Sequence, residues 1–194
     1  FAKIEPWPRT VQPEIPIWIA ASNDRLSFER AGAGGYALMM NQYPMSFAAC
    51  CEKHDWYKAA YAGAGHPQAK RRSAIAFLTY IDDTEEKAVA RAKIAVQEHA
   101  AAFRKVQTHN EWDRDYLGDE TAITGLAPDG DVRTLLAERT LVCSPRQAAE
   151  RLAKYVAAGF TEAILVCRFG DISGAECLRS IERLTHEVRP LLDR

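Results

Sequence analysis

Short apolar runs alternate with amphipathic stretches along most of the chain. Four runs rich in β-branched and aromatic residues end in polar or glycine-containing turns and predict buried strands: 15–21, 36–40, 73–81 and 160–167. Stretches with apolar residues at helical spacing predict helices at 25–33, 46–62, 85–106 and 144–158, with a last helix from about residue 174. About four strand–helix units in this order predict right-handed βαβ connections and a parallel sheet.

Capping signals sharpen the helix boundaries. Ser144, followed by proline and then glutamine, predicts a helix start, and Ser173 with a glutamate three residues later predicts another. Asp83 stands three residues before Glu86 and predicts the cap of the long third helix. Gly34-Gly35 predicts a left-handed helix end. We expect Leu178, Ile181, Leu184 and Val188 to share one face of the last helix, which should end before Pro190.

The composition is that of an ordinary globular domain. The chain has 194 residues, 47% of them hydrophobic and 26% charged, with a formal net charge of -1. This balance indicates no general attraction to nucleic acid or to anionic membranes. No apolar run approaches the roughly 20 residues that span a bilayer. Five cysteines without CxxC spacing are typical of small buried side chains in a reducing compartment, so we expect a cytoplasmic protein.

The strand count leaves two architectures open. A closed (β/α)8 barrel needs eight units and typically about 250 residues. The chain therefore forms either a small open α/β domain or about half of a barrel. It opens on Phe1 rather than on methionine, which suggests processing, an engineered start or a fragment.

Four segments carry a resemblance to a known family. Pro13–Ser22 resembles the P-x-x-P-I-W-V-A-A-S strand of luciferase-like flavin-dependent monooxygenases, and Ser27–Tyr36 is similar to the helix that follows it. Leu141–Leu152 resembles V-G-T-P-E-E-V-A-E-R-L, with Cys143 at the usual glycine, and Arg168–Pro190 resembles R-F-G … R-S-I-E … E-V-x-P. By this resemblance, residues 1–194 are one domain, incomplete at its N-terminus, that supplies strands five to eight of a TIM (β/α)8 barrel.

The resemblance also implies a function. The family binds reduced FMN, uses O2 as co-substrate and oxidises small organic molecules. A flavin reductase would supply the reduced FMN, and a homo-oligomer is expected, with no nucleic-acid or membrane partner. Two alternatives stay open: a deazaflavin-dependent oxidoreductase of the same superfamily, and a non-catalytic flavin-binding or interaction domain, since fold does not fix function.

Function in βα barrels collects at the C-terminal ends of the strands. The turn after the first strand offers a hydroxyl, backbone N–H groups and a guanidinium that could hold the flavin phosphate, which the family places nearby. Arg168 follows the last strand and could pair with an anionic flavin or substrate. The candidate cofactor-binding residues are Ala21, Ser22, Asn23, Arg25, Ser27 and Arg168. The competing interpretation is a simple helix cap with Arg25 and Arg168 in solvent.

The sequence shows no motif typical of a metal site or of nucleophilic or nucleotide-dependent catalysis. The five histidines lack metal-ligand spacing, and G-x-S-x-G, P-loop and G-x-G-x-x-G motifs are absent, so no metal and no catalytic residue is designated. This fits flavin chemistry, in which the cofactor carries the reaction. The irregular segment 107–131 is either an active-site lid or a surface insertion.

Overall fold

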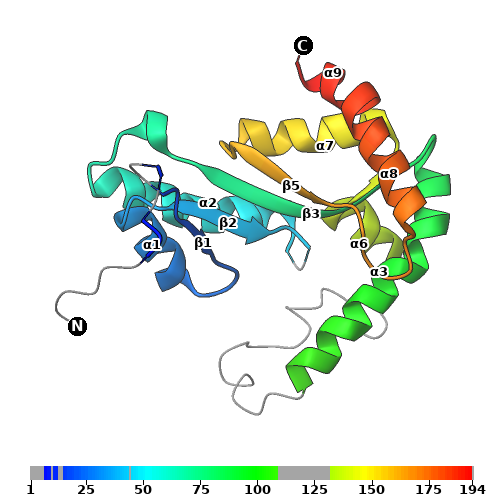
Figure 1. The fold of residues 1–194 in the computed structure, drawn as a ribbon, viewed down its shortest axis with the longest axis horizontal. Helices are drawn as coiled ribbons and strands as arrows, with labels where there is room; N and C mark the ends of the chain where they lie inside the picture. Colours follow the sequence, from blue (N-terminus) through cyan, green and yellow to red (C-terminus); the bar gives the residue numbers. More distant parts are fainter. Residues whose placement is uncertain (1–6, 10, 13–14, 44, 109–131, 194) are drawn as a thin grey trace.

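The computed structural model describes residues 7–9, 11–12, 15–43, 45–108 and 132–193. Strands and helices alternate along this part of the chain (Figure 1). The strands are β1 (Trp18–Ala20), β2 (Ala37–Asn41), β3 (Ser73–Ile81), β4 (Leu141–Cys143) and β5 (Glu162–Val166). The longer helices are α1 (Arg25–Ala33), α2 (Phe47–Gly63), α3 (Glu85–Thr108), α6 (Val132–Arg139), α7 (Pro145–Ala157) and α8 (Gly174–Arg183). Shorter helical turns are η1 (Gln68–Lys70), η3 (Leu184–Val188) and α9 (Arg189–Leu192).

All strand pairs are parallel, as the sequence predicts. The sheet runs β1-β2-β3, and β5 pairs with β3 on the side away from β2. The short strand β4 extends the pairing at the end of β3, where Thr79 aligns with Leu141. All nine residues of β3 are buried, and β2 and β5 flank this strand on its two edges. β1 and β5 form the two outer edges (Figure 1).

One face of the sheet packs against helices α1, α2 and α7. Because strand side chains alternate between faces, this core takes every second residue, such as Leu38, Met40, Ile75 and Phe77. Helices α1 and α2 approach closely at Gly32, where a Cβ atom would lie 2.4 Å from the carbonyl oxygen of Tyr57. Glycine is therefore a packing requirement at this position.

The opposite face is covered at the C-terminal half of β3. Leu78 and Tyr80 pack there against α3, whose Ala88, Ala92 and Val96 are fully buried, and against Phe169. This confirms the predicted apolar stripe of the third helix. On the same face, the last residues of β1 and β2, Ala20 and Asn41, are exposed.

Several predicted boundaries are confirmed and two are wrong. Both serine capping boxes, at Ser144 and Ser173, are present. The third helix begins at Glu85, and the Thr84 hydroxyl accepts the N–H of Lys87, so Thr84 rather than Asp83 caps it. The last helix also continues through Pro190, because a proline in the first turn of α9 loses no intrahelical hydrogen bond.

The predicted apolar face of the last helix does not act as one buried face. Val188 is buried, whereas Leu178 and Ile181 are 62% and 44% exposed. The buried position on α8 is Ser180, whose hydroxyl accepts the N–H of Ile81. The side of α8 that carries Leu178 and Ile181 thus lacks a packing partner among the described residues. Residues 109–131 of the proposed lid segment 107–131 lie outside the described residues.

Candidate functional site

The turn between β1 and α1 holds most of the predicted cofactor residues. Ala21 is buried at the end of β1 and donates its N–H to Met39, while Ser22 and Asn23 are exposed. Asp24 is the N-cap, and its carboxylate accepts the N–H groups of Leu26 and Ser27. The Asp24 carboxylate therefore already binds the free N–H groups at the start of α1.

Ser27 belongs to this cap. Its hydroxyl donates to the Asp24 carboxylate at 2.9 Å, and this bond, with the two backbone bonds, holds the pKa of Asp24 below its usual value. A carboxylate at the helix N-terminus takes the place that a phosphate would otherwise occupy. An anion at this turn has to bind on the side of Ser22 and Asn23.

Lys53 of α2 reaches that side of the turn. Its ammonium donates to the Ser22 carbonyl at 2.6 Å and to Asn23 Oδ1 at 3.2 Å. Partial burial lowers the pKa of Lys53. Sequence reasoning missed this residue because it stands 31 positions from Ser22 on another helix. The packing of α1 on α2 brings it to the turn.

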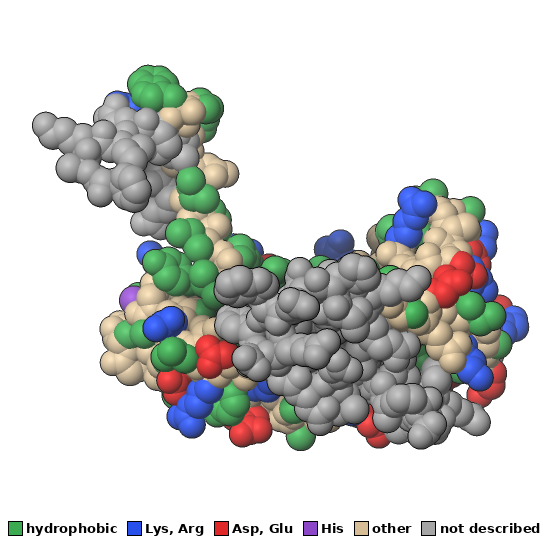
Figure 2. Space-filling model, turned by 90° about the horizontal axis from the view of Figure 1, so that it is seen from below, with side chains coloured by type: hydrophobic (Ala, Val, Ile, Leu, Met, Phe, Trp, Pro, Cys, Tyr) green, Lys and Arg blue, Asp and Glu red, His purple; other side chains and the backbone are tan. Residues whose placement is uncertain are grey.

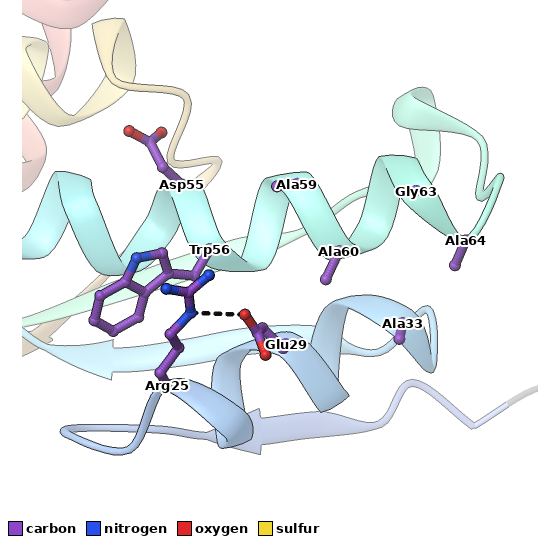
Figure 3. A pocket seen from close by; sticks show the side chains of 9 residues that line it. All are labelled: Arg25, Glu29, Ala33, Asp55, Trp56, Ala59, Ala60, Gly63 and Ala64. Atoms are coloured by element: carbon purple, nitrogen blue, oxygen red, sulfur yellow. Dashed lines mark hydrogen bonds and ion pairs between the residues drawn. The ribbon is translucent and has the colours of Figure 1, made fainter.

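Arg25 points away from the turn. Its guanidinium pairs with Glu29 at 2.7 Å and lies 5.5 Å from the ring centre of Trp56. Figure 3 shows both contacts in a shallow groove between α1 and α2 that is otherwise lined mainly by alanines. This groove has a volume of about 760 Å³ and lies between α1 and α2.

Arg168 lies at the other edge of the sheet. It is exposed and follows β5, which β2 and β3 separate from β1. Three strand spacings correspond to roughly 14 Å, so the structure does not bring Arg168 to the Ser22 turn within one chain.

Aromatic side chains cluster where β2 and β5 end. The ring centres of Tyr43 and His99 are 6.0 Å apart, and those of His99 and Phe169 are 6.3 Å apart, both edge to face. Burial lowers the pKa of His99, which favours its neutral form. His99 is thus the one histidine that the described structure places at the strand C-termini. The helical spacing of apolar residues in α3 did not predict that this helix covers the C-terminal ends of the strands.

An ion network fixes the loop that carries Arg168. Arg91 of α3 pairs with Glu176 at 2.5 Å and with Asp171 at 3.0 Å. The network lowers the pKa of Glu176 to about 2. Gly170, with φ of +51°, lies so close to α3 that a Cβ would be 2.2 Å from the Ala95 carbonyl oxygen. The end of β5 is therefore held rigidly against α3.

The cysteines are not activated. All five are free thiols, and Cys50, Cys143 and Cys167 are buried, as predicted. Desolvation raises the pKa of Cys50 and Cys143 to about 12, so neither forms a thiolate nucleophile at neutral pH. Within the described ranges, no three His, Cys, Asp or Glu side chains gather as metal ligands, and no helix is long and apolar enough to cross a bilayer.

Comparison with protein families shows which family the chain belongs to. The family described as luciferase-like monooxygenase matches residues 2–162. The chain belongs to the luciferase-like monooxygenase family. A comparison with curated proteins finds no significant match to this chain.

Solved structures agree with the family. Monooxygenase RslO1 from Streptomyces bottropensis superposes with a TM-score of 0.71 at 19% identity, covering 95% of this chain and 50% of that one. The oxygenating constituent of 3,6-diketocamphane monooxygenase from Pseudomonas putida, in complex with FMN, gives 0.63 at 18% identity, covering 90% and 48%. The coenzyme F420 dependent tetrahydromethanopterin reductase from Methanopyrus kandleri gives 0.60 at 19% identity, covering 91% and 50%.

These neighbours are TIM-barrel proteins of the luciferase-like type, and the chain spans about half of their length. The βα units therefore have the arrangement of half of such a barrel, as the sequence predicts. Because the identities are below 20%, the similarity to these three structures shows a shared fold and nothing more.

Proposed function

We propose that the chain is part of a flavin-dependent monooxygenase that uses reduced FMN and O2 to oxidise a small organic substrate. The observation that carries the proposal is the family match over residues 2–162. The FMN complex of the diketocamphane monooxygenase supports the choice of flavin. A bound flavin would supply the redox chemistry, and the protein would supply binding and orientation.

The turn after β1 offers a fit for the FMN phosphate. The Lys53 ammonium lies beside the Ser22 carbonyl and the Asn23 side chain, and a cation at a turn that also carries a serine hydroxyl suits a phosphate. Ser27 and Arg25 take a supporting part, because Asp24 and Glu29 already bind their polar groups. Arg168 remains a candidate for the flavin or the substrate, from another side of the strand ends.

A deazaflavin-dependent oxidoreductase is the second candidate. Two neighbours in fold use F420: the tetrahydromethanopterin reductase and a secondary alcohol dehydrogenase. The two candidates differ in chemistry, since a deazaflavin enzyme transfers a hydride and does not activate O2.

Anaerobic titration of the purified chain distinguishes the candidates. We expect reduced FMN to quench the intrinsic tryptophan fluorescence saturably in the micromolar range, and reduced F420 and NADH to bind at least tenfold more weakly. Tighter binding of F420 than of FMN would favour the deazaflavin alternative. If neither reduced FMN nor reduced F420 bound at high micromolar concentration, both candidates would be contradicted.

Removing the phosphate contacts should separate FMN from riboflavin. We expect Ser22→Ala and Lys53→Met each to weaken FMN binding about tenfold or more, because a hydrogen bond to a charged group contributes roughly 1.5–3 kcal/mol. Riboflavin lacks the phosphate, so its affinity should stay unchanged. Ser27→Ala should weaken FMN binding less than Ser22→Ala does, because the Ser27 hydroxyl already bonds to Asp24. Equal loss for both flavins would mean that the turn only caps the helix.

A further inference from the structure

A pocket opens at the N-terminal ends of β1, β2 and β3. It lies between the loop after α1, the segment that leads into β1, and η1, and its volume is about 620 Å³. Figure 2 shows hydrophobic side chains with a histidine and basic side chains at the foot of this leading segment. Ala37 and Asn41 are the first and last residues of β2, so about 13 Å of strand separates the pocket from the end of the sheet that carries the Ser22 turn. The pocket is therefore distinct from the proposed flavin site.

Two glycines admit two rings into the wall of this pocket. A Cβ atom at Gly34 would lie 2.5 Å from Cε2 of Tyr36, and one at Gly35 would lie 2.9 Å from Cε1 of His66. Gly35 also has a φ of +69°, which by itself favours glycine. Gly34, in contrast, has an ordinary helical φ of -77°. At Gly34 it is therefore the neighbouring ring, and not the backbone conformation, that favours glycine.

The ring of His66 is held in a fixed position in this wall. Its Nε2 atom lies 2.9 Å from the carbonyl oxygen of Ala33, and its ring centre lies 5.0 Å from that of the buried Tyr61. A carbonyl oxygen only accepts hydrogen bonds, so Nε2 carries the proton of the neutral ring. The other nitrogen, Nδ1, accepts a hydrogen bond in the neutral ring and donates one when the ring is protonated.

The lining of the pocket contains basic side chains and no acidic ones. Lys70 and Arg72 both line it. The guanidinium of Arg72 donates through Nε to Glu162 at 2.7 Å and lies 4.8 Å from the ring centre of Trp18, so its orientation is fixed and its charge is balanced. Within the described part of the chain, the Lys70 ammonium has no hydrogen bond and no ion pair. Lys70 therefore gives the pocket an uncompensated positive charge.

Stability alone accounts for only some of these features. Residues at the N-terminal ends of barrel strands usually serve stability, and the conformation of Gly35 and the hydrogen bond of His66 fit that role. Tyr36, which is 41% exposed, and the unpaired Lys70 do not. The volume lies within the roughly 300–1,000 Å³ of small-molecule sites. An exposed aromatic ring beside basic groups in such a site suits a ligand with an apolar body and an anionic end.

We propose that this pocket binds a small organic acid with a planar apolar body. The body of the ligand lies against the ring of Tyr36, and its carboxylate is bound by Lys70 and by the terminal nitrogens of Arg72. His66 supplies a further polar contact through Nδ1.

A nuclear magnetic resonance titration of the purified chain with benzoate tests the proposal. It is carried out without flavin, so its result does not depend on the proposed function. We expect the amide signals of Gly35, Tyr36 and Lys70 to shift saturably, with a Kd in the millimolar range or below. Benzamide has the same shape without the charge and should bind about tenfold more weakly or worse, because a hydrogen bond to a charged group is the stronger kind.

Two variants locate the site. Lys70→Gln should weaken benzoate binding about threefold or more, the effect of losing one exposed ion pair. Lys93→Gln is the matched control, because this exposed lysine lies on α3, away from the pocket. Gly34→Ala keeps a backbone conformation that alanine adopts, so the protein should stay folded while the new Cβ displaces the Tyr36 ring and weakens benzoate binding to a similar degree.

Three results would overturn the proposal. The first is the absence of saturable shifts at high millimolar benzoate. The second is binding of benzamide or of inorganic phosphate as tight as that of benzoate, since the site would then select neither the charge nor the apolar body. The third is a benzoate affinity that neither Lys70→Gln nor Gly34→Ala changes.

Discussion

Replacement of Gly32 by alanine is expected to lower the free energy of unfolding by about 3 kcal/mol. The new Cβ would lie 2.4 Å from the Tyr57 carbonyl oxygen and 2.8 Å from the Tyr61 nitrogen. Both are backbone atoms of α2, which cannot move without displacing the helix from the core. The loss arises because α1 and α2 must separate, and chemical denaturation at neutral pH measures it.

Gly63→Ala is the matched control for this prediction. Gly63 ends α2, and a Cβ there would meet no atom within 4 Å. Alanine favours the helical backbone, so we expect this variant to be unchanged or more stable by about 0.5 kcal/mol. Equal destabilisation of both variants would contradict the close approach of the two helices.

Acidification is expected to destabilise the protein through His54. This side chain is fully buried, stacks 4.0 Å from the ring centre of Phe160, and bonds through Nε2 to the Ser73 hydroxyl at 3.0 Å. Burial, and then the charges of Lys58 and Arg71, lower its pKa from 6.5 to about 4. Between about pH 6.5 and pH 4, therefore, His54 is mostly protonated in the unfolded chain and mostly neutral in the folded protein.

The sign and the pH window follow from these two values. The contribution is fully present above pH 6.5, decreases as the pH falls below 6.5, and is lost by about pH 4. It amounts to about 3 kcal/mol, to be measured as the free energy of unfolding in urea at pH 7 and pH 4.5. The stability that Glu176 contributes, with its pKa lowered from 4.5 to about 2, is lost mainly as the pH falls from about 4.5 to 2.

His54→Phe separates this effect from other titrations. Phenylalanine keeps a ring stacked on Phe160 but does not titrate, so most of the pH dependence between 6.5 and 4.5 should disappear. His99, whose pKa is also lowered, should account for a smaller remainder. A wild-type stability that does not vary in this range would contradict the prediction.

The candidate site could be predicted only in part. The turn at Ser22 follows from strand–turn–helix order, because the C-terminal ends of parallel strands lie at one edge. The partners of its residues could not be predicted in the same way. Asp24 and Glu29 are near in sequence, but their competition for Ser27 and Arg25 depends on side-chain rotamers. Lys53 and His99 are distant in sequence, and only helix packing places them at the strand ends.

The sequence by itself determined the parallel strand–helix order, the ends of β3 and of α1, and both serine capping boxes, because these depend on neighbours a few residues apart. The tertiary structure decided what lies opposite each element. It placed α3 over the C-terminal half of β3, buried Ser180 in place of Leu178, and put β1 and β5 at the two edges of the described sheet. The physical reason is that periodicity records which side of an element is apolar, whereas the partner of that side depends on contacts between distant segments. In a barrel-type sheet those contacts are completed only when every strand has two neighbours.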